Sequence, residues 1–295
     1  MAAVAPTTAM ILSPRSAGPQ ARAQARIGRL TLFLVTLIGI GAFLAPFVAP
    51  GALASGDSST ARMQDSPLIT AVLSVACLVV LFANLGPALS SKAVALLGVL
   101  IGINVVLRAF DLAFLPPGEF SPVFLLIALV GYGFGAQMGF LMGALTMLCS
   151  AFFTGGIGPW LPFQMFAAGW MGMSAAWLPG RGSTLGTARS EVIWLAVFGF
   201  VWGFLYGAIV NLYFWPFLVD AGAMAGMGWT PGASPGEAVA RYAIFYVVQS
   251  AGPDAVRALG NAALMLVLGW PLLRVFRRFR ARFDYVLVEV TQQEA

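Results

Sequence analysis

An uncharged run over residues 122–153 sets the strongest limit on how this chain can fold. As one helix, rising about 1.5 Å per residue, the run would be about 48 Å long, whereas the hydrocarbon core of a bilayer is about 30 Å thick. Gly131, Gly133 and Gly135 lie near its middle, and glycine tolerates the backbone angles of a tight turn. The run therefore predicts two short membrane helices joined by a glycine turn on the cytoplasmic side.

The composition supports an all-α integral membrane protein. Of the 295 residues, 60% are hydrophobic and only 9% are charged, which is unlike a soluble domain. Histidine, the commonest general base and a frequent metal ligand, is absent, and Cys77 and Cys149 lie apart within apolar runs. We therefore expect no enzyme, no metal and no cofactor. The basic residues flank apolar runs instead of forming one stripe, so nucleic acid is not expected as a partner.

The pattern of apolar runs predicts about eight membrane-spanning helices. Two of them divide the run at 122–153, and the others lie at about 30–48, 67–85, 92–112, 162–178, 191–217 and 253–276. Residues 1–29 are expected to form a disordered cytoplasmic tail and 281–295 a cytoplasmic C-terminal tail. Residues 219–239 are expected to form an outer loop, with 240–250 as a candidate short helix across the outer face.

The positions of the positive charges test the predicted number of spans, because loops rich in lysine and arginine stay on the cytoplasmic side. Eight spans place the basic N-terminal tail and the arginines of 274–282 on one side, with only Arg62 and Arg241 on the other. One long helix over 122–153 would move the arginine-rich C-terminus outside. We therefore expect a multi-pass protein of the cell membrane with both termini in the cytoplasm.

Residues 154–172, TGGIGPWLPFQMFAAGWMG, combine a glycine- and proline-rich turn with the start of a helix. Trp160 suits the membrane interface, whereas the Gln164 amide needs a polar partner about one turn into an apolar helix. An ordinary interfacial turn explains this pattern. The alternative is a rigid lid over a small-molecule site.

Arg108 is expected in the outer half of the bilayer, where a charge is costly unless it is paired or hydrated. One explanation is a snorkelling arginine paired with Asp111, three residues further on. The other is an inward side chain that binds substrate, which Asn104 one turn below supports.

Several polar residues are expected near the outer side although they come from separate parts of the chain: Arg108, Trp160, Gln164, Asn211 and Asp254. Asp254 has a simple alternative explanation, because a carboxylate after Pro253 suits the first turn of a helix. Their shared depth nevertheless predicts an outward-opening pocket with aromatic walls and a few orienting polar groups.

Gly98 and Gly102 form a pair of small residues four apart in the same predicted helix as Arg108. Such a pair lets another helix approach closely. That helix could belong to this chain or to a partner.

Several motifs in order resemble the substrate-binding (S) components of energy-coupling factor (ECF) vitamin transporters, nearest to the cobalamin-type branch. They are INVVLRAF, GYGFGAQMGFLMGALTMLCSAFFTGG, GxGPWxPFQMxAxGWxG, NLYFWPF and GPDAVRALGNA. The resemblance covers about 92–279 and implies a six-helix substrate-binding core over 91–280. Residues 30–90 are then two additional N-terminal helices.

The resemblance also implies roles for residues and partners. Asn104 and Arg108 match an Asn-x-x-x-Arg pair of the first core helix, and Gly98 and Gly102 stand where the family has an Ala-x-x-x-Ala pair that docks on the transmembrane T component. Two ATPase subunits would supply the energy, because no P-loop motif is present here. Cobalamin or a related corrinoid is the expected substrate. A secondary transporter working alone and a membrane scaffold remain alternatives.

Overall fold

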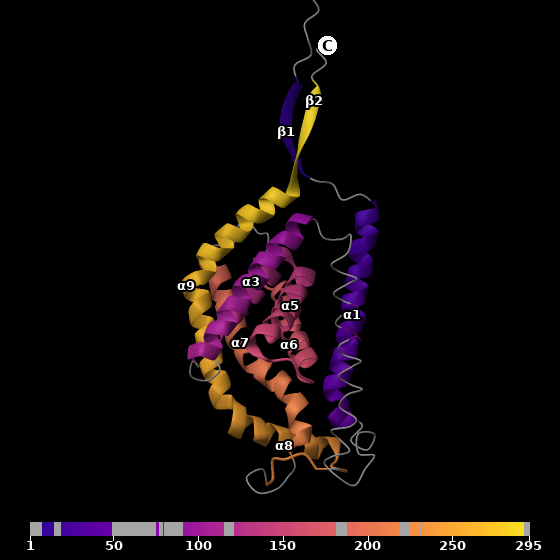
Figure 1. Cartoon of the computed structure of the whole chain (residues 1–295), viewed down its shortest axis with the longest axis vertical. Coiled ribbons are helices and arrows are strands. Elements are labelled where there is room, and N and C mark those ends of the chain that lie inside the picture. Colours follow the sequence, from indigo (N-terminus) through magenta and orange to yellow (C-terminus); the bar gives the residue numbers. More distant parts are fainter. Residues whose placement is uncertain are drawn as a thin grey trace, which may run out of the picture.

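The protein is an elongated bundle of helices with a two-stranded ribbon at one end (Figure 1). The structure, a computed structural model, describes residues 8–14, 19–48, 75–76, 79, 91–114, 121–180, 188–218, 225–230 and 232–291. The helices in chain order are α1 (Pro19–Val48), α3 (Ser91–Phe114), α4 (Val123–Phe134), α5 (Ala136–Thr154), α6 (Leu161–Ala175), α7 (Ala188–Phe214), the 3-10 turn η2 (Trp215–Phe217), α8 (Pro235–Phe245), the π-helical turn η4 (Tyr246–Ser250) and α9 (Ala251–Asp284). The strands are β1 (Thr8–Pro14) and β2 (Tyr285–Thr291), which pair antiparallel.

Among the described residues, five stretches are long and apolar enough to cross a membrane. They are Arg26–Leu44, Ser91–Asp111, Ala136–Thr154, Arg189–Phe214 and Pro235–Phe279. The expected number of eight spans is not confirmed. The helix expected at 67–85 lies outside the described residues except at 75–76 and 79, which are helical.

The expected break inside residues 122–153 is confirmed, and it falls at Gly135. This residue has φ 108° and separates α4 from α5, a conformation that only glycine adopts without strain. The first of the two helices differs from the expectation, however. Residues 123–130 of α4 are at most 6% exposed, so this short helix is enclosed by its neighbours. A helix that is apolar on all sides fits such a position.

Three segments differ from the expected organisation. Residues 1–29, expected to be a disordered tail, contain β1 and the first part of α1, where the alanine-, arginine- and glutamine-rich sequence favours helix. The C-terminal tail contains the end of α9 and β2. The expected loop at 219–239 includes the start of α8, where the Ser234 hydroxyl accepts a bond from the Glu237 amide at 3.3 Å. This N-cap was readable in the sequence as Ser-x-x-Glu.

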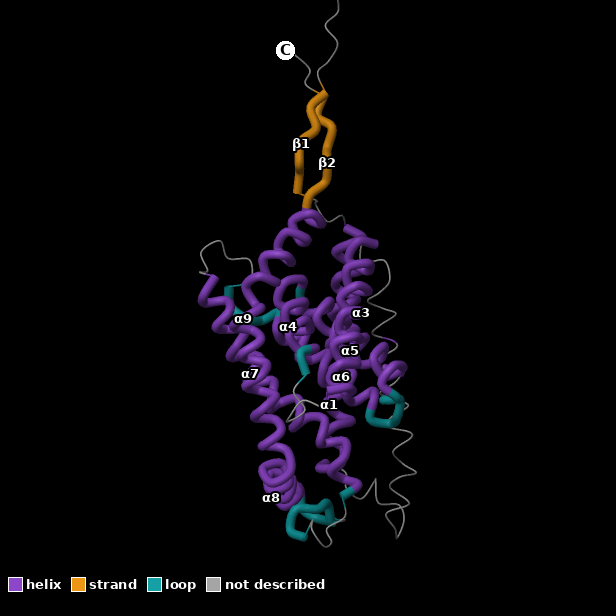
Figure 2. The backbone as a smooth tube through the Cα atoms, turned by 60° about the vertical axis from the view of Figure 1, so that its left-hand side comes forward, coloured by secondary structure: helices purple, strands orange, loops and turns teal. Residues whose placement is uncertain are grey.

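Helix α7 packs closely against α9 through three glycines spaced four apart, as the two helices run side by side (Figure 2). A Cβ added at Gly203 would lie 2.3 Å from the Cα of Ala258, and one at Gly207 would lie 2.0 Å from Oδ2 of Asp254. Gly199 faces Asn261 less tightly, at 3.4 Å. Small residues of this kind let membrane helices approach backbone to backbone.

Helix α1 lies on the side of the bundle formed by α6, α7 and α8. Its Phe43 ring packs edge-on against Phe163 at 4.9 Å, and its Phe47 ring stacks on Trp215 at 5.3 Å. The opposite face of α1 exposes large apolar side chains, including Phe33, as expected for contact with lipid.

We expect Gly203→Ala to destabilise the protein, because its methyl group would collide with the α9 backbone. Overpacking typically costs about 1–3 kcal/mol, which outweighs the gain of about 1 kcal/mol in helix propensity. Gly252→Ala is the matched control, since a Cβ there meets nothing within 4 Å. Thermal unfolding in detergent should show a lower melting temperature for Gly203→Ala and no loss for Gly252→Ala. Equal melting temperatures would contradict this account of the α7–α9 contact.

Candidate functional site

A cavity of 610 Å³ lies at the end of the bundle opposite the β1–β2 ribbon, where α3, α5 and α7 end and α6 and α9 begin. Aromatic and apolar side chains, among them Phe124, Val210 and Phe214, form part of its wall. Its polar and charged lining includes Arg108, Asp111, Gln164, Asn211, Asp254 and Arg257. Polar and charged side chains thus outnumber the apolar ones in the lining, and the hollow is of a size that holds a small molecule.

Four of the six expected binding residues meet in this cavity. Arg108 comes from α3, Gln164 from α6, Asn211 from α7 and Asp254 from α9. Four different helices thus bring these side chains to one hollow. Asn104 and Trp160 do not line it.

Asn104 is fully buried and holds α3 against its neighbours. Its Nδ2 donates to the carbonyl oxygen of Val123 and to Oγ1 of Thr146, both at 3.2 Å. These bonds fix the face of α3 on which Arg108 sits one turn later. Asn104 therefore bonds within the protein and does not line the cavity, and its role in binding stays a prediction.

Trp160 closes the glycine loop on itself. Its indole Nε1 donates to the carbonyl oxygen of Gly156 at 3.1 Å, and a Cβ added at Gly158 would lie 2.5 Å from the indole ring. Gly155 adopts φ 65° at the end of α5. The loop is thus a compact cap, and Thr154 and Gly156 are its parts that reach the cavity.

Arg108 forms no ion pair with Asp111, which one of the two explanations of this arginine had assumed. Its Nη1 instead donates to Sδ of Met147 at 3.3 Å, while Asp111 accepts a hydrogen bond from the hydroxyl of Ser121. Tyr206 also points its hydroxyl at the Met147 sulfur, at 3.8 Å. Within the part of the chain that the structure describes, no carboxylate lies within ion-pair distance of the Arg108 guanidinium.

Asp254 and Arg257 form a buried ion pair on α9, with side chains only 3% and 5% exposed. Nη1 of Arg257 also donates to the Gly203 carbonyl oxygen at 3.4 Å, and its guanidinium lies 5.6 Å from the centre of the Tyr206 ring. A simple helix start does not explain Asp254, because α8, η4 and α9 form one continuous helical segment through it. The pair belongs to the wall of the cavity.

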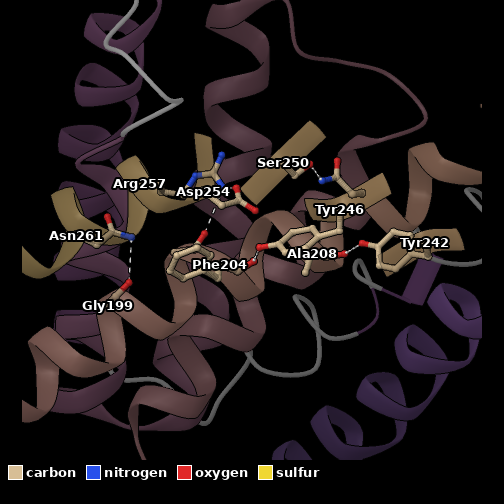
Figure 3. Close-up of polar contacts among 11 residues, drawn as sticks. Gly199, Phe204, Ala208, Tyr242, Tyr246, Ser250, Asp254, Arg257 and Asn261 are labelled. Carbon is tan, nitrogen blue, oxygen red and sulfur yellow. Dashed lines mark hydrogen bonds and ion pairs between the residues drawn. The ribbon is translucent and has the colours of Figure 1, made fainter. Parts of the chain in front are cut away.

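The α8–η4–α9 segment is tied to α7 by bonds to main-chain carbonyl oxygens (Figure 3). Asn261 Nδ2 donates to Gly199 at 3.4 Å, the Tyr246 hydroxyl donates to Phe204 at 3.3 Å, and the Tyr242 hydroxyl donates to Ala208. Asn211 on α7 in turn donates from Nδ2 to Oγ of Ser250. These contacts hold η4 against the cavity.

Some lining residues were not expected from the sequence. Gln249 and Ser250 reach the cavity because η4 is a π-helical turn, and no residue pattern in the sequence marks such a turn. Tyr206 lies in an aromatic run that reads equally well as lipid-facing. Asp111 was expected only as a pairing partner of Arg108, and Arg257 was not among the expected binding residues. Among the described residues, no group of three His, Cys, Asp or Glu side chains could hold a metal ion.

Comparison with known proteins finds one match, which is to a family model. Neither the curated proteins nor the solved structures contain a match. A family model described as "ECF transporter, substrate-specific component" matches residues 92–271, which include α3 to α8 and most of α9. This match spans more than half of the chain and contains every described element that lines the cavity. The chain therefore belongs to the family of substrate-specific components of ECF transporters.

Proposed function

We propose that this protein captures a vitamin-like solute in the cavity and delivers it through an ECF-type importer that partner ATPases drive. The family match supports a membrane-embedded substrate-binding subunit. The observation that carries the proposal is the meeting of Arg108, Gln164, Asn211 and Asp254 in one hollow within the matched region. ATP hydrolysis would be supplied by the partners, because the sequence has no P-loop.

The proposed orientation places the cavity on the outer side of the cell membrane. The opposite end of α9 carries Arg274, Arg277 and Arg278, and basic residues near span ends favour the cytoplasm. Both termini are then cytoplasmic. In this topology residues 30–90 supply two helices in addition to a six-helix core, which gives eight spans.

Cobalamin or a related corrinoid is the substrate that the sequence resemblance nominates. The cavity volume of 610 Å³ falls within the range of about 300–1,000 Å³ that encloses drug-sized ligands. A corrinoid, a four-ring macrocycle with a nucleotide loop, would enter such a cavity only in part. The vitamin class is therefore proposed more broadly than the corrinoids.

Gly98 and Gly102 are the proposed docking site for the T component. Both glycines are exposed on α3, and a Cβ at either position meets nothing within 4 Å. Helix α1, which packs on α6, α7 and α8, leaves them uncovered. An open pair of small residues four apart suits the close approach of a partner helix.

Gly98→Leu combined with Gly102→Leu is expected to abolish co-purification with the T component, because two leucine side chains would keep the partner helix at a distance. The melting temperature of the isolated protein should stay unchanged, since a Cβ at either position meets no described residue within 4 Å. Gly41→Leu on α1 is the control, because its Cβ also meets nothing within 4 Å. Full assembly of the double variant would rule out this docking face.

Uptake should require ATP and the partner subunits. In proteoliposomes that contain this protein, the T component and both ATPases, a radiolabelled vitamin panel that includes cyanocobalamin should show accumulation of at least one compound. Omitting ATP or the T component should abolish accumulation. The alternative function, secondary transport, predicts uptake by this protein alone under a proton or sodium gradient. That outcome would overturn the proposal.

A further inference from the structure

One face of α9 points away from the bundle where this helix approaches the β1–β2 ribbon (Figure 1). Four exposed residues, spaced four, three and four apart, share that face: Val267, Pro271, Arg274 and Arg278. The core-facing side chain of Leu273 is only 1% exposed by comparison. The exposed face therefore changes along the helix from apolar to positively charged.

The arginines at this end of α9 differ in whether a carboxylate neutralises them. Arg277 forms an ion pair with Glu191 of α7, whose side chain is 1% exposed. Arg274 and Arg278 have no such pair, because no carboxylate of the described ranges lies within 4 Å of either guanidinium. These two like charges lie one helical turn apart, which is unfavourable. An anion bound between them would remove the repulsion.

Trp270 restrains Arg274 and marks its depth in the membrane. The guanidinium carbon of Arg274 lies 5.6 Å from the centre of the Trp270 ring, a contact that orders the side chain without neutralising its charge. Tryptophan favours the membrane–water interface, and the apolar stretch Pro235–Phe279, long enough to cross a membrane, ends here. Val267, which is 71% exposed, lies about 16 Å further into the bilayer than Arg278.

We infer that this face of α9 binds one anionic phospholipid, with the lipid phosphate between Arg274 and Arg278 and an acyl chain along Pro271 and Val267. The guanidinium fork suits a phosphate group. Two arginines without a carboxylate partner disfavour the cationic group of a zwitterionic headgroup, so the site selects a lipid with net negative charge. This face is separate from the cavity, and the inference does not rest on the proposed import function.

The test measures lipid retention on the purified full-length protein by native mass spectrometry. The probes are dioleoyl phosphatidylglycerol and dioleoyl phosphatidylcholine in equal amounts, which share their acyl chains and differ in headgroup charge. The unaltered protein should retain phosphatidylglycerol in preference. Arg274→Gln combined with Arg278→Gln should weaken this preference about 30-fold, since each basic residue near a membrane surface contributes a factor of about five.

Two further variants separate the charges from their arrangement. Arg274→Lys combined with Arg278→Lys keeps both charges without the planar forks, so it should retain part of the preference. Trp270→Leu keeps both arginines and removes the ring that orders Arg274, so it should weaken the preference by a smaller factor than the double glutamine variant.

Arg26→Gln combined with Arg189→Gln is the matched control. It removes two exposed arginines at the same end of the bundle, from α1 and α7, and leaves α9 unchanged. The preference for phosphatidylglycerol should then stay the same. The melting temperatures of the lipid-free variants verify that each one is folded.

Glycerol 3-phosphate distinguishes a lipid site from a site for a soluble phosphate. It has no acyl chains, so it should not displace retained phosphatidylglycerol, and displacement at equal concentration would overturn the inference. Equal retention of the two lipids, or an equal loss in the control variant, would also overturn it. Unchanged lipid retention by the double glutamine variant, with loss of co-purifying ATPases, would show that this face serves a protein partner instead.

Discussion

The close contact between α7 and α9 is the interaction on which the cavity depends. In a bilayer, helices gain little from burying apolar surface against each other, so association relies on close packing and interhelical hydrogen bonds. The glycines at 199, 203 and 207 remove the side chains that would hold the helices apart. Arg257 and Asn261 then reach the carbonyl oxygens of Gly203 and Gly199. The close approach of α7 and α9 allows these hydrogen bonds, and the hydrogen bonds in turn hold the two helices together.

This contact also explains how charged groups are accommodated at the cavity wall. Asp254 lies against Gly207, where any side chain on α7 would displace it. Arg257 is surrounded by the Asp254 carboxylate, the Gly203 carbonyl oxygen and the Tyr206 ring. Each of these neighbours is favourable for a guanidinium, so this buried charge needs no ligand. Arg108, which lines the same cavity from α3, donates instead to the Met147 sulfur, with Asp111 also in the lining.

The π-helical turn η4 links the fold to the site. A π-turn has one extra residue per hydrogen-bonded ring, so it rotates the side chains that follow it. Here Gln249 and Ser250 line the cavity, while Tyr246 at the start of the turn is bonded to Phe204. An uninterrupted α-helix would present a different set of residues. Such turns occur frequently at functional sites, and this one lies at the cavity.

The sequence by itself determined the membrane class, the break within residues 122–153 and four of the residues that meet in the cavity. These features follow from span length, glycine conformation and the cost of polar groups in lipid, all of which act locally along the chain. The helix N-cap at Ser234 was equally local and could have been read from the sequence. Only the tertiary structure decided that Asn104 and Trp160 bond to the protein itself, that Arg108 contacts Met147 in place of Asp111, and that η4 adds Gln249 and Ser250. The physical reason is that these outcomes depend on which helices become neighbours and how closely they approach, and residue spacing within one helix does not specify either.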